Sequence, residues 1–252
     1  MLILAYHSVN PNRQDALSVH PDIFAKQMDI LRQKYEVVTL DSLIQALAEH
    51  RNTDRMAAIT FDDGYRDNFL YAYPLLRERN LPATIFLIAS YIGTDKTLGN
   101  PGGIKVEDYR FLSWEEVKEM GRYGISFGSH TFTHPWLTHI SRDEAVHEIR
   151  GSKTFLEEKI GAPIEFFCYP FGDFNEAIKE IVINSGYRGA VITPSKPLKA
   201  GDLYALKRVG VYRHNSLLAF RFKISPYFAA MRDNHLLWEA ARGVKRLWRR
   251  AG

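Results

Sequence analysis

The amino-acid sequence predicts one large α/β domain built on a parallel sheet, either open or closed into a (β/α) barrel. Short apolar runs alternate with amphipathic segments along most of the 252 residues. Most of these runs are continuous, which is expected for strands that are covered on both faces. The repeated order of strand and helix is typical of parallel α/β folds, and about seven or eight such units would suit a barrel.

The predicted strands are short apolar runs, most of them followed by polar or glycine-containing segments. In a parallel α/β fold, active-site residues are expected just after the C-terminal ends of such strands. The runs cover residues 2–6, 36–39, 57–61, 83–88, 125–127, 164–169, 189–192 and 206–209.

The predicted helices have apolar residues on one side and, in most cases, an N-terminal capping signal. Asp41 is expected to cap one helix. Ser113 with Glu116, and Ser141 with Glu144, have the spacing of capping boxes. The helices cover residues 21–34, 42–50, 114–122, 142–161 and 175–185. A long segment without periodicity, 93–109, is expected to form an irregular loop that could cover a site.

The bulk composition is that of a soluble globular protein, with 46% hydrophobic and 25% charged residues. A chain of this length buries most of its apolar surface without a disulfide or metal, so any metal would serve chemistry. The single cysteine, Cys168, excludes an intrachain disulfide and is expected to be a buried, inert thiol. Because no basic signal region and no run of ~18 apolar residues is found, a cytoplasmic location is expected, provided that no leader has been removed.

Basic residues are concentrated at the end of the chain. The net charge is only +4, yet the last twelve residues contain five basic and no acidic residues. Residues 236–250 place apolar side chains on one stripe opposite the basic ones, a pattern typical of helices that lie on a membrane surface. A helix packed on the domain, with its basic face in water, is an equal alternative. We assign 216–252 as a basic helical extension that could contact the inner membrane face peripherally, and we expect no nucleic-acid partner.

Two adjacent carboxylates, Asp62 and Asp63, follow the strand 57–61 and precede Gly64. In a regular strand they would point to opposite faces, but at a strand end with a glycine turn both can face one cavity. Because burying two unpaired carboxylates is costly, a cation or another strong partner is then required. A solvated Asp-Gly turn is the alternative.

Two histidines, His130 and His134, follow the strand 125–127. Their spacing of four residues places both imidazoles on one side of a helical turn or tight loop, as in many metal sites. With nine histidines in the chain, one pair at this spacing has a fair chance of arising at random. The pair is interpreted as a metal site because it also follows the C-terminal end of a predicted strand. One carboxylate and two histidines leave metal positions open for water and substrate, which is typical of catalytic sites.

Three motifs of this sequence resemble, in order and spacing, those of the polysaccharide deacetylase (NodB-homology) family, which is also called carbohydrate esterase family 4. They are Thr60-Phe61-Asp62-Asp63-Gly64, Ser129-His130-Thr131-x-x-His134 and Tyr169-Pro170-Phe171-Gly172. The resemblance covers roughly residues 1–215, which we take as the deacetylase domain. It implies a distorted (β/α) barrel of about seven strands and one divalent metal, usually zinc. It also implies hydrolysis of N-acetyl groups in amino-sugar polymers.

The resemblance also implies roles for individual residues. Asp63, His130 and His134 would bind the metal, and Asp62 would be the general base that takes a proton from water. Phe171, the residue after the motif's proline, would donate its backbone N–H to the oxyanion. These roles agree with general chemistry, since a metal acidifies water while a carboxylate collects the proton.

Two departures from the family pattern change the expected site. The arginine that usually orients the base is replaced by Cys168, and the usual Leu-x-His motif near the C-terminus, which supplies the general acid, is missing. The N-terminal Leu4-Ala5-Tyr6-His7-Ser8-Val9 resembles the opening motif of a circularly permuted branch, the poly-N-acetylglucosamine deacetylases. In that branch His7 would protonate the leaving amine. Arg208 is a candidate for the missing cation, although an arginine at a strand end is usually a surface charge.

The leading hypothesis is a metal-dependent N-deacetylase that acts on an N-acetylhexosamine-containing polysaccharide or its oligosaccharide or lipid-linked precursor. Zinc is the first choice of metal, with cobalt, nickel or iron as alternatives. A metal-dependent deacylase or amidase for a small non-glycan substrate is the second hypothesis. A non-catalytic glycan-binding module ranks third, because both carboxylates and both histidines are present. Trp136 could stack on a sugar ring, but packing in the core is the first expectation for it.

Overall fold

The computed structural model describes residues 1–98, 109–194 and 201–234. Its centre is a parallel sheet in which the strands run in the order β10-β9-β8-β7-β6-β5-β1-β11. The strands are β1 (Leu2–Tyr6), β5 (Met56–Phe61), β6 (Ala83–Leu87), β7 (Ile125–Ser129), β8 (Phe166–Cys168), β9 (Gly189–Ile192), β10 (Leu206–Lys207) and β11 (Val209–Gly210). β4 (Glu36–Val37) pairs with β5 beside this path, and β2 (Ser8–Val9) pairs with β3 (Ser18–Val19) in a separate sheet.

The sheet closes into a barrel because β10 and β11 are successive parts of one segment. β10 pairs with β9, whereas β11 pairs with β1, so this segment joins the two ends of the sheet. At the junction, the N–H of Arg208 donates to the carbonyl of Ile192 at 2.8 Å, and the N–H of Val211 donates to the carbonyl of Ala5 at 2.9 Å. Within the described residues, this confirms the predicted distorted barrel of about seven strands.

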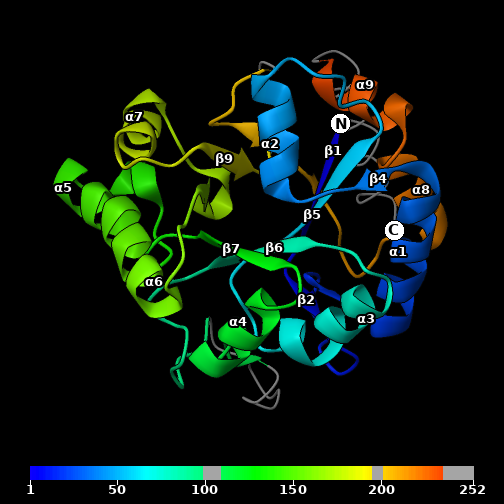
Figure 1. Ribbon diagram of the computed structural model, residues 1–252, viewed down its shortest axis with the longest axis horizontal. Helices are drawn as coiled ribbons and strands as arrows, with labels where there is room; N and C mark the ends of the chain where they lie inside the picture. Colours follow the sequence, from blue (N-terminus) through cyan, green and yellow to red (C-terminus); the bar gives the residue numbers. More distant parts are fainter. Residues whose placement is uncertain (99–108, 195–200, 235–252) are drawn as a thin grey trace, which may run out of the picture.

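Helices surround the central strands in Figure 1. The predicted capping boxes of Ser113 with Glu116 and of Ser141 with Glu144 are both present. The helices are α1 (Pro21–Lys34), α2 (Leu40–Ala48), α3 (Tyr73–Glu78), α4 (Trp114–Gly121), α5 (Arg142–Val146), α6 (Ser152–Ile160), α7 (Glu176–Asn184), α8 (Leu217–Lys223) and α9 (Pro226–Asp233). π-helical turns occupy Asn68–Ala72 and His147–Gly151, and the second joins α5 to α6.

The prediction that Asp41 caps α2 is wrong. Thr39 is the cap, since its extended backbone lets its hydroxyl accept a hydrogen bond from the N–H of Ser42 at 3.0 Å. Asp41 lies in the first turn instead, where a carboxylate is favourable near the positive end of the helix dipole.

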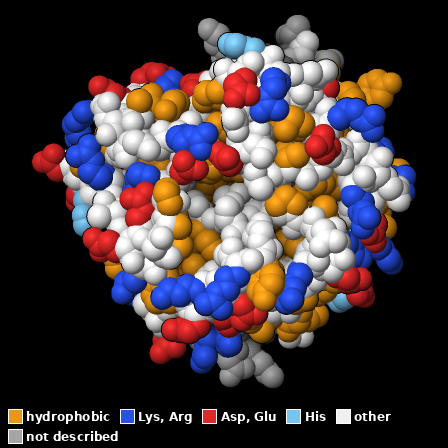
Figure 2. Space-filling view, viewed as in Figure 1, with side chains coloured by type: hydrophobic (Ala, Val, Ile, Leu, Met, Phe, Trp, Pro, Cys, Tyr) orange, Lys and Arg blue, Asp and Glu red, His pale blue; other side chains and the backbone are white. Residues whose placement is uncertain are grey.

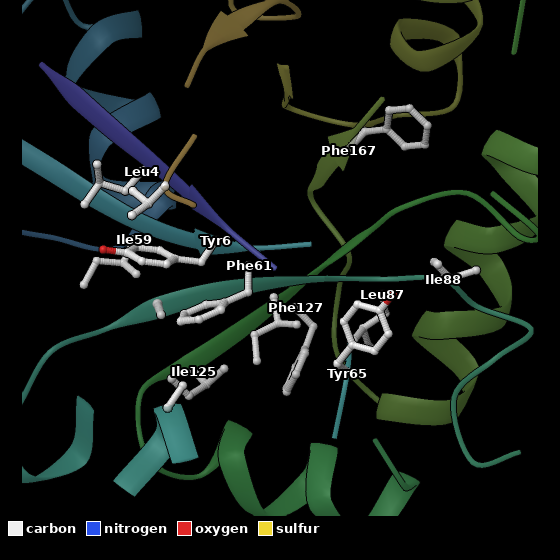
Figure 3. Packing of buried hydrophobic residues seen from close by; sticks show 14 of the residues in the cluster. Leu4, Tyr6, Ile59, Phe61, Tyr65, Leu87, Ile88, Ile125, Phe127 and Phe167 are labelled. Carbon is white, nitrogen blue, oxygen red and sulfur yellow. The ribbon is translucent and has the colours of Figure 1, made fainter. Parts of the chain in front are cut away.

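Side chains of each strand alternate between a core outside the barrel and one inside it. On β5, Ala57, Ile59 and Phe61 belong to the outer core. In Figure 3, Phe61 and Phe127 extend from β5 and β7 toward the surrounding helices. The inner core comprises Ile3, Ala58, Phe86, Phe166, Cys168, Val191 and Leu206 together with Leu40, Leu43 and Ile44 of α2. Because α2 joins this inner core, it closes the N-terminal end of the barrel and leaves the C-terminal end for a site.

The first part of the predicted extension packs on the domain. The hydroxyl of Tyr35 donates to the carbonyl of Ile224, and Lys223 Nζ donates to the carbonyl of Gly210 at 2.7 Å. The predicted amphipathic segment 236–250 lies outside the described residues, as do residues 99–108 of the predicted irregular loop. None of the helices in the described ranges has both the length and the hydropathy that a bilayer span requires. The domain boundary at residue 215 remains a prediction.

Candidate active site

A cavity of about 310 Å³ opens at the C-terminal ends of the barrel strands. All seven residues that the sequence singled out as site residues line it. They come from the ends of β1, β5, β7 and β8 and from the segment that closes the barrel. The lining residues are His7, Leu17, Asp62, Asp63, Tyr65, Leu98, His130, His134, Tyr169, Phe171, Gly172, Thr193, Arg208 and Tyr212. A larger cavity of about 510 Å³ between Met1 and α9 contains none of these seven residues.

A left-handed turn directs both carboxylates toward the cavity. Asp62 continues the ladder of β5, because its N–H donates to the carbonyl of Tyr6 at 2.9 Å. Asp63 then adopts φ 72° and Gly64 adopts φ 80°. Glycine is favoured at this position, because it adopts a positive φ without strain and a Cβ would lie 2.7 Å from Leu87 Cδ2. The glycine turn therefore does what the sequence suggested, and both side chains are buried.

Arg208 forms a bidentate ion pair with the Asp62 carboxylate. Its Nη1 and Nη2 donate to Asp62 Oδ1 and Oδ2, both at 2.6 Å, and Nη1 also donates to Thr60 Oγ1 at 3.0 Å. Nη2 lies 3.1 Å from Cys168 Sγ, so the guanidinium reaches from the barrel-closing segment to the cysteine that replaces the expected arginine. Burial alone would raise the pKa of Asp62, but Arg208 holds the pKa of this carboxyl well below its usual range.

Asp63, His130 and His134 form a compact group of metal donors. Asp63 Oδ1 lies 3.6 Å from both His130 Nε2 and His134 Nε2, and the three donor atoms lie within 4.8 Å of one another. These distances are too long for hydrogen bonds. Ligand atoms of a tetrahedral zinc ion with bonds of ~2.1 Å are roughly 3.4 Å apart, so the spacing fits such an ion.

The protonation states of this group also fit a cation. His130 Nδ1 lies 2.8 Å from the carbonyl of Cys168, which can only accept, so Nδ1 carries the proton and Nε2 is free to bind a metal. Burial lowers the pKa of His130 to about 4 and that of His134 to about 3. Burial and the neighbouring charge of Asp62 raise the pKa of Asp63 to about 8. A divalent ion would supply the positive charge that the buried Asp63 carboxylate lacks.

A second possible donor group, Asp62 with His130 and Cys168, fits a metal less well. Both oxygens of Asp62 already accept hydrogen bonds from Arg208, and burial raises the pKa of the Cys168 thiol well above its usual value. A metal there would have to displace the arginine and bind a protonated thiol. Cys168 is therefore buried and unreactive, as predicted.

His7 follows β1 and lies beside the Asp62 carboxylate. Its Nε2 is 3.8 Å from Asp62 Oδ2, and its side chain is mostly buried. Its Nδ1 is buried and has no hydrogen-bond partner among the described residues. Burial lowers the pKa of His7, although the charge of Asp62 opposes this shift. The structure thus brings the first histidine of the chain next to the predicted base.

Phe171 occupies a tight turn at the rim of the cavity. It adopts φ 58° and ψ 3°, and no acceptor for its N–H is found in the described part of the chain. Its ring stacks on Trp136 with centroids 4.2 Å apart and planes 9° apart, and it contacts the His134 ring at 4.7 Å. The expectation of a core position for Trp136 is wrong, since 48% of it is exposed. Trp136 stacks instead on Phe171, which is itself 53% exposed at the rim of the cavity.

Sequence reasoning missed several residues around the site. Leu17 and Tyr212 line the cavity from segments without a recognisable motif. Glu148 accepts hydrogen bonds from the loop between the two histidines, although its position in a helical pattern gave no signal. Arg13, 1% exposed, lies between the rings of Tyr65 and Tyr109 at 4.4 and 4.0 Å. Tertiary contacts alone bring these residues to the site, so no local sequence pattern indicates them.

Comparison with known proteins agrees with the geometry. The family model for polysaccharide deacetylases matches residues 49–190. YxkH of Bacillus subtilis, which is assigned to the polysaccharide deacetylases, is 30% identical over 212 residues, covering 83% of this chain and 70% of YxkH. The poly-beta-1,6-N-acetyl-D-glucosamine N-deacetylase of Escherichia coli is 23% identical over 258 residues, covering 88% of this chain but only 38% of that protein.

Solved structures show the same fold. The Streptococcus pyogenes deacetylase PplD, in complex with acetate, superposes with a TM-score of 0.75 at 25% identity, covering 90% of this chain and 98% of PplD. IcaB from Ammonifex degensii superposes with a TM-score of 0.73 at 25% identity, covering 92% and 97% of the two chains. From the matched family model, the similarity to YxkH and the shared barrel, we conclude that this chain belongs to the polysaccharide deacetylase family.

Proposed function

We propose that this protein removes N-acetyl groups from N-acetylhexosamine residues of a polysaccharide, or of its oligosaccharide or lipid-linked precursor, with one divalent metal ion. The observation that carries the proposal is the convergence of Asp63, His130 and His134 on one point of a cavity that Asp62 and His7 also line. The relatives that are N-deacetylases of N-acetylglucosamine polymers support the choice of substrate class.

Zinc is the proposed metal, held by Asp63, His130 and His134. The donor set of one carboxylate and two imidazoles leaves room for water and substrate, which is typical of catalytic zinc. When bound, the ion lowers the pKa of water and polarises the acetyl carbonyl.

The other residues act on protons and on developing charge. Asp62 takes the proton of the attacking water, and the N–H of Phe171 donates to the oxyanion as it forms at the acetyl carbonyl. His7 protonates the leaving amine. Because Asp62 Oδ2 and His7 Nε2 are 3.8 Å apart, the group that collects a proton is next to the group that delivers one.

Arg208 orients the base. The two short bonds from its guanidinium fix the plane of the Asp62 carboxylate and keep it ionised. In this proposal Arg208 supplies, from the last barrel segment, the positive charge that Cys168 cannot supply from the end of β8.

The proposal is tested by acetate release from N-acetylglucosamine oligomers by the zinc-loaded protein. Asp62→Asn should lower kcat at least ~100-fold, since general base catalysis is typically worth 10²–10⁴-fold. It should retain one zinc per chain by elemental analysis. Asp143→Asn, an exposed carboxylate of α5, is the matched control and should behave as the unchanged protein. Full activity of the zinc-bound Asp62→Asn variant would refute the base assignment, and acetate release that is indifferent to zinc removal would refute the metal assignment.

We also propose that the C-terminal part of the chain contacts an anionic membrane surface. Residues 214–252 contain eight basic and two acidic residues. Leu218 and Tyr227 of α8 and α9 are 78% and 80% exposed, and Phe222 is 48% exposed. Exposed apolar and aromatic side chains next to basic residues are typical of interfacial segments. On the face drawn in Figure 2, by contrast, acidic and basic side chains are interspersed, which is not the pattern of a nucleic-acid site.

A further inference from the structure

The loop that carries two of the proposed metal ligands has a strained backbone. Between His130 and His134, the non-glycine residues Thr131 and His134 both adopt φ 67°. Left-handed backbone costs a residue with a side chain ~1–2 kcal/mol, so such a conformation persists only where surrounding contacts impose it. One local contact helps, because Thr131 Oγ1 accepts a hydrogen bond from the N–H of His134 at 2.9 Å.

A buried carboxylate, Glu148, binds the middle of this loop. Its Oε2 accepts hydrogen bonds from the N–H groups of Phe132 and Thr133, both at 2.8 Å, and its Oε1 accepts one from the Thr133 hydroxyl at 2.6 Å. Glu148 is 7% exposed. Hydrogen bonds to an ionised acceptor are shorter and stronger than neutral ones. All three donors belong to the two residues after Thr131, inside the segment between the two imidazoles.

Glu148 lies within a π-helical turn. The helix 142–160 widens to π geometry at His147–Gly151 and then resumes as α6. Such turns are rare and are frequent at functional sites. Directly after this turn, Ser152 Oγ lies 2.7 Å from Ser129 Oγ, at the end of β7. Within the turn, the carbonyl of Ile149 accepts a hydrogen bond from the hydroxyl of Tyr187 at 2.9 Å.

One face of this helix therefore contacts both ends of the segment that leads from β7 into the loop. Glu148 and Ser152 are four residues apart, a spacing that places two side chains on the same face of a helix. The helix contacts β7 through Ser152 and the loop through Glu148.

We propose that Glu148 is a positioning residue of the metal centre, which holds the loop so that His130 Nε2 and His134 Nε2 converge on Asp63 before the ion binds. The inference rests on the proposed function, in which these three residues are the ligands. A loop that is ordered in advance pays less conformational entropy on binding, so the carboxylate acts on metal affinity and not on the chemical step. Partners of this indirect kind are typically worth 10- to 100-fold in metal affinity.

The test compares zinc dissociation constants, measured by chelator competition on the metal-free full chain. Glu148→Ala should weaken zinc binding by about 10- to 100-fold. Glu148→Gln should bind zinc within about 3-fold of the unchanged protein, because its carbonyl oxygen can accept both N–H groups while its NH₂ donates to the Thr133 hydroxyl. At saturating zinc, kcat of Glu148→Ala should return to near the unchanged value.

A matched control separates this role from general stabilisation. Glu157, on the same helix, accepts a hydrogen bond from the N–H of Ile164 at 3.0 Å and pairs with Lys153 at 2.8 Å, outside the site. Glu157→Ala should destabilise the fold in urea unfolding but leave zinc affinity unchanged. If Glu148→Ala does not fold, Thr133→Val removes one of the three bonds and should weaken zinc binding about 5-fold.

Two results would overturn the inference. One is zinc affinity unchanged in Glu148→Ala, or unchanged in Thr133→Val where that variant replaces it. The other is an equal loss of affinity in the Glu148 and Glu157 variants. A protein that binds no zinc even when unchanged would instead refute the proposed metal centre itself, so the two failures are distinguishable.

Discussion

Replacing Arg208 by methionine tests how the buried charge of Asp62 is balanced. In the structure, both oxygens of Asp62 accept bonds of 2.6 Å from the guanidinium, and Arg208 is 2% exposed. Methionine has a similar length but no charge, so Asp62 would be left buried without its partner. In the metal-free protein, no other cation bonds directly to this carboxylate among the described residues, since His7 is 3.8 Å away.

The expected loss of folding stability is about 4 kcal/mol. Two unit charges with centres ~4 Å apart interact by ~4 kcal/mol at the effective dielectric constant of about 20 that suits protein sites. Removing one partner of a buried ion pair typically costs ~3–5 kcal/mol, which agrees with that figure. For a chain of this size, 1 kcal/mol shifts Tm by roughly 2–4 °C, so Arg208→Met should lower Tm by roughly 8–16 °C.

The loss should depend on pH in a defined direction. Arg208 lowers the pKa of Asp62 in the folded state, so the ion pair contributes its full stability above the unfolded pKa near 3.9 and loses it as the pH falls below that value. Without Arg208, burial raises the pKa of Asp62, and acid then relieves the penalty by protonating the carboxyl. The difference between Arg208→Met and the unchanged protein should therefore be largest near pH 7 and smaller near pH 4.

The assay is urea unfolding of metal-free protein at both pH values, in a double-mutant cycle with Asp62→Asn. In the double variant no charge is buried, so the stability loss of Arg208→Met should be largely recovered, with a coupling energy of roughly 3 kcal/mol. The reasoning is refuted if Arg208→Met changes the unfolding free energy by less than about 0.5 kcal/mol, or if the two substitutions are simply additive.

Three further predictions concern the acid, the metal and the membrane. His7→Gln should lower kcat by ~10²–10⁴-fold without changing zinc affinity; loss of zinc binding would place His7 among the ligands instead. At pH 7, zinc binding should release ~0.9 proton from Asp63, whose pKa of about 8 keeps it mostly protonated without metal. Calorimetry in buffers of different ionisation enthalpy measures the number of protons released. This number should be much smaller at pH 9.5, where Asp63 is already ionised. The full chain should co-sediment with vesicles that contain anionic lipid but not with neutral ones, and Leu218→Ser with Tyr227→Ser should reduce this; equal binding to neutral vesicles, or to RNA, contradicts the proposed surface.

Local patterns in the sequence determined most of the scaffold. Continuous apolar runs located the barrel strands, because a strand that is buried on both faces must be apolar throughout. Both capping boxes were correct, since they depend on residues only three positions apart. The assignment of Asp41 as a cap failed because several adjacent residues could cap α2, and only the backbone at Thr39 decides between them.

The candidate metal ligands could also be predicted, because Asp63, His130 and His134 follow strands whose C-terminal ends meet at one edge of the barrel. Arg208 was a weaker prediction. It is 146 residues from Asp62 in sequence, and only the closing segment between β9 and β1 brings the two together.

Only the tertiary structure decided the contacts between elements that are distant in sequence. Glu148 binds the histidine loop from a π turn that hydrophobic periodicity does not predict. Trp136 stacks on Phe171 across two loops instead of entering the core. The sequence by itself determined the chemistry available and the strands that carry it, because motif spacing and burial are local properties. Which side chains orient that chemistry depends on strand register and helix rotation, and these are set by the packing of the whole barrel.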